Sequence, residues 1–372
     1  MVSEAEFEAA GLFDPAINAG TGRLELLHWL AAKGFTIPEM VAALEWPGLG
    51  GLAGDRRIVT GERLSDERAR EISGLGPEHF TALVAALGFV PWAGSTDGEL
   101  GLTATEAETL SLFGPLSTLF TDDETLDFIR VVSSALARMA EAAVSLFLID
   151  VEMPHLASRG DELELAEKVY DAVGLLDELI PMLDPLLRRQ VLHATERSRY
   201  STINALERLQ HRYAVGFVDL VGFTPLSQAM SPAELRFFIS DFERRAHDAV
   251  AASGARLVKL IGDEVMFVSH DPDAAGAVAQ ALMTNFAVGD GSDVAPRGGL
   301  AYGEVLVRGG DYYGAVVNLA SRLADAAAPR ELLVTEPFAE ASSTLDFAPA
   351  GRRMLKGFAD PVAARSAYFG DG

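Results

Sequence analysis

The 372-residue sequence contains no cysteine. The chain therefore forms no disulfide and offers no thiolate to a metal ion, which fits a cytoplasmic protein. Positive charge is also scarce, because 54 acidic residues outnumber 30 basic ones and the formal net charge is -24. This balance argues against an extended surface for nucleic acids or anionic membranes.

Long apolar runs are missing as well, and no secretory leader is expected. The longest apolar stretch, near residues 142–149, is too short for a transmembrane helix, so no transmembrane segment is expected. The first residues, MVSEAEFEAAGLF, are acidic and lack the basic start of a signal peptide. Hydrophobic residues make up 49% of the chain, enough for the cores of two or three domains.

The first 200 residues predict almost only helices. Residues 70–89 indicate two short helices around a Gly-Pro turn, either a DNA-binding helix-turn-helix or, as the few basic residues favour, a hairpin within a bundle. Residues 161–209 carry a long helical pattern that Pro181 and Pro185 should kink or divide. A further helix starts at residue 122, and its expected apolar face consists of Leu126, Ile129, Val132, Leu136 and Met139.

After residue 212, strand-like runs alternate with helical ones. The order predicts an α+β sandwich of ferredoxin-like type. The expected elements are a strand at 214–221, a helix at 232–253, a hairpin at 255–269, a helix at 271–285, a strand near 297–303, a helix at 315–326 and a strand at 331–335. We therefore expect an all-α regulatory domain at 1–182, a helical linker at 183–209 and a catalytic domain at 210–372.

Two acidic residues stand where strands end. Asp219 interrupts the apolar run AVGFVDLV, and a buried carboxylate needs a cation or a proton. Gly262 and Asp263 form the expected two-residue turn of the hairpin. If the hairpin pairs beside the first strand, the two carboxylates approach each other, and two divalent ions would relieve their repulsion. The alternative is an ordinary turn with a solvated Asp263.

Three separated segments, FVDLVGFT, KLIGDEVMF and DYYGAVVNLASRL, resemble in order and spacing the catalytic domain of class III nucleotidyl cyclases. The resemblance covers residues 205–372. The helical first half is similar to the regulatory module of soluble actinobacterial adenylate cyclases, including pH-responsive ones. Diguanylate cyclases share a similar core, but their Gly-Gly-Asp-Glu-Phe signature is absent from this sequence.

The resemblance implies a metal site and a base-reading pair. Asp219 and Asp263, joined by the backbone carbonyl of Leu220, match the ligands of two divalent ions, Mg²⁺ or Mn²⁺. Lys259 and Asp311 match the lysine and the acid that read the purine. Lys259 can donate to N1 of adenine and Asp311 can accept from its 6-amino group, whereas guanine reverses this pattern. ATP is therefore the expected substrate, and 3′,5′-cyclic AMP and pyrophosphate are the expected products.

The remaining matches lie further along the chain. Asn318 falls where the family orients the ribose, and Arg322 falls where an arginine stabilises the pentavalent phosphate. Their i, i+4 spacing puts both side chains on one face of a helix. Lys356 is a looser match to the residue that holds the terminal phosphates.

In the family, the metal ligands come from one catalytic domain and the purine readers from another. A chain with a single such domain would therefore act as a head-to-tail homodimer with two composite sites. The helical half could switch turnover by separating or rotating the catalytic domains. A guanylate cyclase, a nucleotide-binding module without catalysis and a DNA-binding regulator are the alternative functions.

Two hypotheses concern the regulatory signal. His193 lies near Arg188, Arg189 and Arg197 on the linking helix, where it could act as a pH switch or remain an ordinary solvated histidine. The apolar helices of residues 122–187 could enclose a lipid or another small ligand, or could pack densely against one another.

Overall fold

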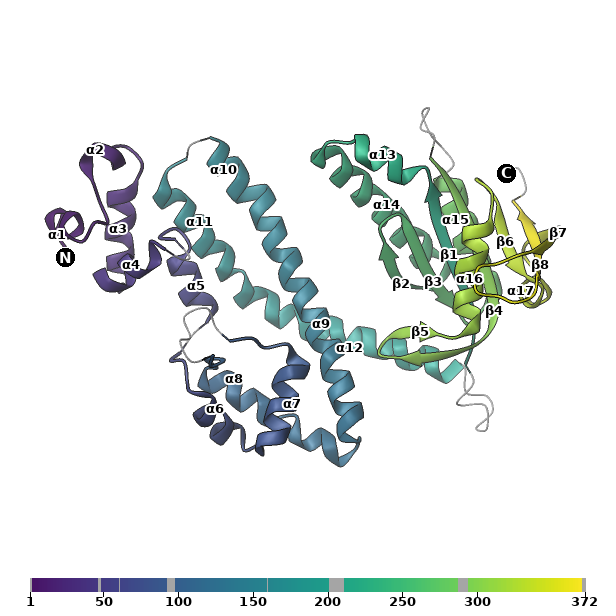
Figure 1. The fold of residues 1–372 in the computed structure, drawn as a ribbon, viewed down its shortest axis with the longest axis horizontal. Helices are drawn as coiled ribbons and strands as arrows, with labels where there is room; N and C mark the ends of the chain where they lie inside the picture. Colours follow the sequence, from purple (N-terminus) through teal and green to yellow (C-terminus); the bar gives the residue numbers. More distant parts are fainter. Residues whose placement is uncertain are drawn as a thin grey trace. The chain divides into compact units, whose positions relative to one another are not determined.

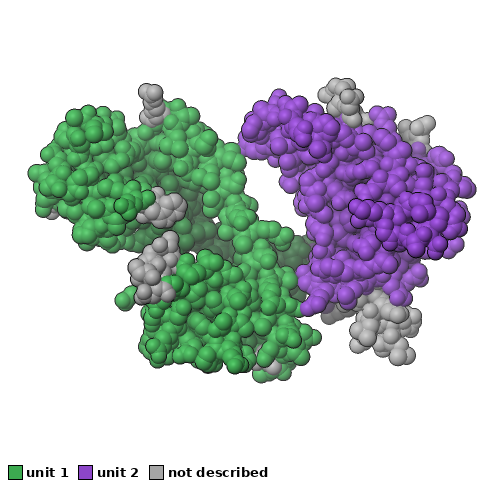
Figure 2. All heavy atoms as spheres, viewed as in Figure 1, with its two compact units in different colours: residues 1–192 green, residues 193–372 purple. Residues whose placement is uncertain are grey.

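A computed structural model describes residues 2–45, 48–59, 61–91, 98–158, 160–200, 211–286 and 294–369. The chain divides into two compact units, residues 1–192 and 193–372 (Figure 2). The first unit consists of helices, and the second contains a mixed sheet with helices on both faces (Figure 1). The predicted fold class, a helical region followed by an α+β domain, is confirmed.

The helical unit has two separate cores. The first helices along the chain are α1 (Glu4–Ala9), α2 (Pro15–Asn18), α3 (Arg23–Ala32), α4 (Ile37–Ala43) and α5 (Leu52–Ile58). The first core lies among these helices and includes Ala166 of α11 (Glu162–Gly174). The second core is built from α6 (Asp66–Ser73), α7 (Pro77–Leu87), α8 (Ala104–Ser111) and α9 (Asp122–Phe147), and a short turn of helix, η1 (Gly114–Thr118), precedes α9.

Helix α9 is only partly covered within its unit. It starts with a capping box in which Thr121 and Glu124 satisfy each other's backbone N–H groups. Ile129 is buried in the second core, but Leu136 and Met139, on the same expected face, are 52% and 43% exposed. The predicted apolar face is therefore a core element only along its first half.

Residues Asp122–Ala157 form one helical stretch through α9, η2 (Leu148–Glu152) and α10 (Met153–Ala157). By length and composition alone this stretch could cross a membrane, and none of its most apolar window is buried. A single such helix is weak evidence. The absence of a transmembrane segment stays a prediction.

Helix α12 (Leu176–Tyr200) departs from the expected pattern. Pro181 and Pro185 lie inside it, and the division from α11 comes at Leu175 instead. The prolines therefore do not divide the helix, and the predicted alternative, a kink at the prolines, stays a prediction. Residues 201–209, the expected end of this helical pattern, lie outside the described residues.

The second unit is a single sheet with strand order β2-β3-β1-β4-β6-β8-β7, and β5 pairs with β4 beyond this path. The strands are β1 (His211–Val221), β2 (Arg256–Ile261), β3 (Glu264–Ser269), β4 (Ala295–Arg308), β5 (Asp311–Tyr313), β6 (Leu332–Thr335), β7 (Asp346–Arg353) and β8 (Val362–Tyr368). The helices are α13 (Phe223–Ala229), α14 (Pro232–Ser253), α15 (Pro272–Asn285), α16 (Ala315–Ala326) and α17 (Glu336–Ala341).

The two faces of the sheet have different coverings. Alternate residues of β1, such as Val218 and Leu220, pack in one core with α14 and α15. The residues between them, such as Val215 and Phe217, pack in another core with Ala320 and other residues of α16. Because successive side chains on a strand point to opposite faces, Asp219 belongs to the α16 face.

Candidate active site

Three charged side chains form a row across the α16 face of the sheet. In the antiparallel register, Asp219 of β1 lies opposite Glu264 of β3 on one side and Arg297 of β4 on the other. Directly opposed residues in antiparallel strands project to the same face, so the three side chains are neighbours. The row lies at the end of β1 that leads into Gly222, the start of α13.

Arg297 uses its whole guanidinium group within this row. Its Nε and Nη2 donate to Oδ2 of Asp219 at 2.9 and 2.7 Å. Its Nη1 donates to the backbone oxygen of Asp325, near the end of α16, at 2.8 Å. The half-buried carboxylate of Asp219 thus has a counter-charge, and this arginine ties β1 to α16.

The β2–β3 hairpin brings further acids to the same place. Gly262 has a φ of +64°, which suits the first position of a two-residue turn, and Asp263 follows it. Burial, with smaller contributions from the charge and hydrogen bonding of Asp219, raises the pKa of Asp263. Burial, followed by the charges of Asp219, Asp325 and Asp263, raises the pKa of Glu264 to about 7.

This donor set fits divalent cations. Burial, followed by the neighbouring carboxylates, raises the pKa values of Asp263 and Glu264 even with Arg297 present, so a bound cation would stabilise their ionised forms. Oxygen ligands are those that Mg²⁺ and Mn²⁺ prefer. Leu220 lies opposite Pro296, which has no N–H to donate to the Leu220 carbonyl oxygen. Among the described residues, no three acidic or histidine side chains are close enough to hold an ion alone. Ligands from the backbone and the substrate would have to complete the site.

A second polar pair lies between β2 and β5. Nζ of Lys259 donates to Oδ2 of Asp311 at 2.5 Å, and the backbone N–H of Tyr312 donates to Oδ1 at 2.8 Å. Partial burial is the largest single effect and raises the pKa of Asp311. The two hydrogen bonds and the charges of Lys259 and Arg256 together outweigh it, so the net pKa lies below its usual value. Asp311 is therefore an ionised acceptor held beside an ammonium donor.

Helix α16 carries the next two predicted residues. Asn318 and Arg322 are one helical turn apart, and Nη1 of Arg322 donates to Oδ2 of Asp325 at 2.7 Å. The helix approaches β4 closely at Gly299, where an added Cβ would come within 2.2 Å of the Ala320 backbone oxygen. The missing side chain at Gly299 thus sets the height of α16 above the sheet.

Known proteins are similar to this chain over the catalytic unit alone or over nearly its whole length. The family model described as the adenylate and guanylate cyclase catalytic domain matches residues 208–363. An uncharacterized protein of Mycobacterium tuberculosis is 32% identical over 96% of this chain and 92% of its own length. The chain belongs to the class III nucleotidyl cyclases.

Two relatives carry functional names. A pH-sensitive adenylate cyclase of Mycobacterium tuberculosis is 29% identical over 92% of this chain and 88% of its own length. An adenylate cyclase of Streptomyces coelicolor is 37% identical over 57% of this chain and 54% of its own length. The family assignment and the nucleotide-binding catalytic domain are therefore secure at the level of a nucleotidyl cyclase.

Lys356 and Lys259 lie near opposite edges of the sheet. Lys356 is exposed in the turn between β7 and β8, whereas β2, with Lys259, is at the opposite edge of the sheet. The neighbour of Lys356, Leu355, is buried in one small core with Leu323 of α16. The turn is thus tied to the helix that carries Arg322, and the role of Lys356 stays a prediction.

His193 has a different environment from the one expected. Its Nδ1 lies 3.5 Å from a carboxylate oxygen of Glu196, and Arg188 pairs with Asp184. The side chain of Arg197 lies outside the described residues. The hypothesis of a pH switch assumed cations around His193, but the ionisable neighbour that the structure places beside it is the carboxylate of Glu196.

Four charged residues around the cyclase site were not predicted from the sequence: Glu264, Arg297, Asp325 and Arg256. Glu264 directly follows a predicted ligand, so its position in the motif could have drawn attention to it. Arg297 becomes significant only once the β1–β4 register sets it opposite Asp219. A charged residue in a predicted strand gives no signal of its cross-strand neighbour.

Proposed function

We propose that the chain is an adenylate cyclase that converts ATP to 3′,5′-cyclic AMP and pyrophosphate. The observation that carries the substrate choice is the 2.5 Å pair of Lys259 and Asp311. The ammonium group is a donor for N1 of adenine, and the carboxylate is an acceptor for the 6-amino group. Guanine would set its N1–H against the ammonium and its O6 against the carboxylate, which leaves polar groups unpaired.

Two divalent ions, Mg²⁺ or Mn²⁺, would be held by the carboxylates of Asp219 and Asp263 and the carbonyl oxygen of Leu220. When bound, such ions activate the attacking 3′-oxygen and neutralise phosphate charge. The raised pKa of Asp263 supports this assignment, because a nearby cation would stabilise its ionised form.

The other residues of the chain position the substrate and stabilise charge. Asn318 would orient the ribose, and Arg322 would match the oxygens of the reacting α-phosphate with its planar guanidinium. Nη1 of Arg322 donates to the carboxylate of Asp325, so this hydrogen bond would have to break before Arg322 could bind the nucleotide. Lys356 would contact the terminal phosphates.

We propose that the active form is a homodimer, in which one subunit supplies the metal ligands and the other the base-reading pair. Exposed apolar side chains flank both half-sites, as a partner surface requires. Ile261, two residues before Asp263, is 51% exposed. Leu306 and Tyr313, which pair across the β4–β5 hairpin beside Asp311, are 62% and 50% exposed.

The helical unit would also take part in dimerisation and regulation. Apolar residues exposed on α9 and α12, including Leu136, Val144, Leu186 and Leu187, offer further surface for a second copy. The pH-sensitive relative supports pH as one candidate signal. A pocket of about 230 Å³, lined by α7 and the start of α9, is one place for a small apolar ligand. We place the enzyme in the cytoplasm, where ATP is available.

One assay tests the proposal. The purified full chain is incubated with ATP or GTP and with Mg²⁺ or Mn²⁺, across about pH 5.5 to 8.5. We expect cyclic AMP from ATP, no comparable product from GTP, and loss of turnover in Asp263→Ala. Product from GTP alone would make the chain a guanylate cyclase, and nucleotide binding without product would make it a binding module.

A further inference from the structure

Arg256 stands on the strand that carries Lys259, three residues earlier. Its Nη2 donates to the backbone oxygen of Gly310 at 2.9 Å, and its Nη1 donates to the hydroxyl of Tyr312 at 3.3 Å. Gly310 and Tyr312 are the residues on either side of Asp311. One guanidinium group on β2 therefore binds the residues directly before and after Asp311, the acid of the base-reading pair. We call these two hydrogen bonds the Arg256 tether.

The Arg256 tether matters because β5 has backbone pairing with only one strand, β4. The strand is three residues long and pairs with β4, whereas β2 lies two strands beyond β1 in the sheet. No ladder of backbone hydrogen bonds thus joins β2 to β5. The backbone of Asp311 pairs with Arg308 of β4, and the polar contacts that link this segment to β2 come from the side chains of Arg256 and Lys259.

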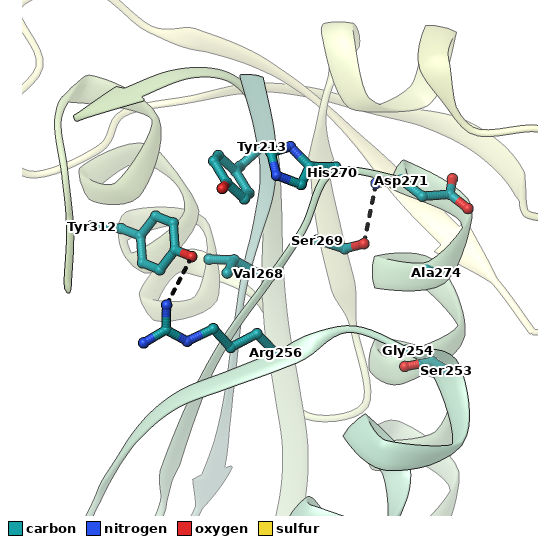
Figure 3. Close-up of a pocket in the computed structure, with 10 residues that line it drawn as sticks. All are labelled: Tyr213, Ser253, Gly254, Arg256, Val268, Ser269, His270, Asp271, Ala274 and Tyr312. Atoms are coloured by element: carbon teal, nitrogen blue, oxygen red, sulfur yellow. Dashed lines mark hydrogen bonds between the residues drawn. The ribbon is translucent and has the colours of Figure 1, made fainter. Parts of the chain in front are cut away.

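Side-chain packing behind this contact is incomplete. Arg256 and Tyr312 line a pocket of about 420 Å³, together with Tyr213, His270 and Ser269 (Figure 3). In Figure 3 a dashed line joins the guanidinium group to the Tyr312 hydroxyl. Close packing normally fixes a side chain from all sides, but here one side is open. The hydrogen bonds of Arg256 therefore carry more of the positioning than they would in a filled core.

Tyr312 connects the tether to the core. Its side chain is buried, and its ring meets that of Tyr213 edge to face at 5.0 Å. This ring contact helps to hold β5 against β1. The Arg256 hydrogen bonds add a direct link from β2 to the residues on either side of Asp311.

We propose that Arg256 is a positioning residue that sets the base selectivity of the enzyme by holding β5, and with it Asp311, in register with Lys259. This inference rests on the proposed adenine-reading role of the Lys259–Asp311 pair. Arg256 does not contact the base. It keeps the acceptor where the 6-amino group of adenine arrives and where the O6 of guanine is rejected.

The test compares kcat/KM for ATP and GTP in the full chain and its variants. We expect Arg256→Met to lower kcat/KM for ATP about tenfold and to reduce the ATP-to-GTP ratio, because a lost charged hydrogen bond at a specificity site has this size of effect. Tyr312→Phe, which keeps the ring and removes only the hydroxyl, should shift the ratio in the same direction by a smaller factor. Arg256→Lys should resemble Arg256→Met, because an ammonium group cannot reach both acceptors in the geometry of a guanidinium fork.

Arg245→Met is the matched control. Nη1 of Arg245 also donates to a backbone oxygen, that of Asn285 at 2.9 Å, but away from β5. This variant should keep the wild-type ATP-to-GTP ratio even if its thermal midpoint falls. A merely structural role of Arg256 would likewise lower the thermal midpoint and turnover with both nucleotides without changing their ratio.

Asp311→Ala distinguishes failure of the Arg256 tether from failure of the proposed base-reading role. If Asp311→Ala shifts the ratio while Arg256→Met and Tyr312→Phe leave it unchanged, the tether is refuted and the base-reading function stands. If Asp311→Ala also leaves the ratio unchanged, the base-reading function fails and the tether fails with it. A wild-type ratio in Arg256→Lys beside a reduced ratio in Arg256→Met would show that charge alone matters, which contradicts the double tether.

Discussion

Arg297 directs two N–H groups at a single oxygen of Asp219, from Nε at 2.9 Å and from Nη2 at 2.7 Å. In the metal-free protein this pair neutralises the acid that we assign to metal binding. Because both side chains are partly buried, each charge compensates for the hydration that the other has lost.

The first prediction concerns Arg297→Met. In EDTA, the uncompensated Asp219 should lower the free energy of unfolding by about 2 kcal/mol, the typical cost of losing a charged hydrogen-bond partner. Added Mn²⁺ should restore most of this loss, since the cation takes over the charge. Urea unfolding with and without Mn²⁺ measures both values. Arg365→Met, which breaks the 2.8 Å pair with Glu336, is the control, and its loss should not depend on Mn²⁺.

The second prediction concerns pH. The pKa of Glu264 rises from 4.5 to about 7 on folding, so between these values the folded state retains a proton that the unfolded state has released. Stability should therefore fall as the pH rises from about 4.5 to 7, and the deficit should be complete above pH 7. Glu264→Gln removes the deficit. We expect it to stabilise the metal-free protein at pH 8 by about 1–2 kcal/mol, a value discounted for partial solvent exposure, with little effect near pH 4.5.

Thermal unfolding of the metal-free protein at several pH values tests this expectation. Glu304→Gln, at an exposed position on β4, is the control and should not change the pH dependence. A Glu264→Gln variant whose stability falls with pH as steeply as that of the wild type would refute the assignment of this dependence to Glu264.

The third prediction tests the composite site. Lys259→Ala and Asp263→Ala should each be nearly inactive as homodimers, because each removes an essential group from both sites. In a mixed dimer, one site loses both groups and the other keeps both. Mixing the two variants under exchanging conditions should thus recover about a quarter of wild-type activity, since half of the random dimers are mixed and each has one intact site. No recovery despite demonstrated subunit exchange would argue for sites formed within single chains.

The fourth prediction concerns the contact between β4 and α16. Gly299→Ala would place a Cβ at 2.2 Å from the Ala320 backbone oxygen and 2.4 Å from the Ala324 backbone nitrogen. Neither backbone atom can move alone, so α16 must rise from the sheet with Asn318 and Arg322. We expect a loss of about 1–3 kcal/mol in stability and a larger loss in kcat than in nucleotide affinity.

Circular dichroism and steady-state kinetics measure these two effects of Gly299→Ala. Gly276→Ala is the control. The residue lies inside α15, and its added Cβ would meet side chains instead of backbone, Leu345 at 3.0 Å and Phe338 at 4.0 Å. Equal losses in the two variants would show that the β4–α16 contact has no special role.

Elements with a strong local pattern were predictable from the sequence. The helix at 315–326 has the predicted bounds, and the hairpin turns at Gly262 and Asp263 as expected. The apolar run at 214–221 also indicated a buried strand that carries an acid, Asp219. In each case, neighbouring residues alone determine the structure.

Features that depend on distant residues could not be predicted. Strand β5 has three residues, too few for a periodic signal, and the Arg297–Asp219 pair depends on the register of two strands 78 residues apart. The exposed second half of α9 looked like a core element, because an apolar face predicts burial without saying which molecule provides it.

Asp325 holds Arg297 with its backbone oxygen and Arg322 with its side chain. Two arginines of the proposed site are thus anchored to one residue near the end of α16. A displacement of α16 would therefore change the hydrogen bond that holds Arg322 and the one that holds Arg297 beside Asp219 at the same time.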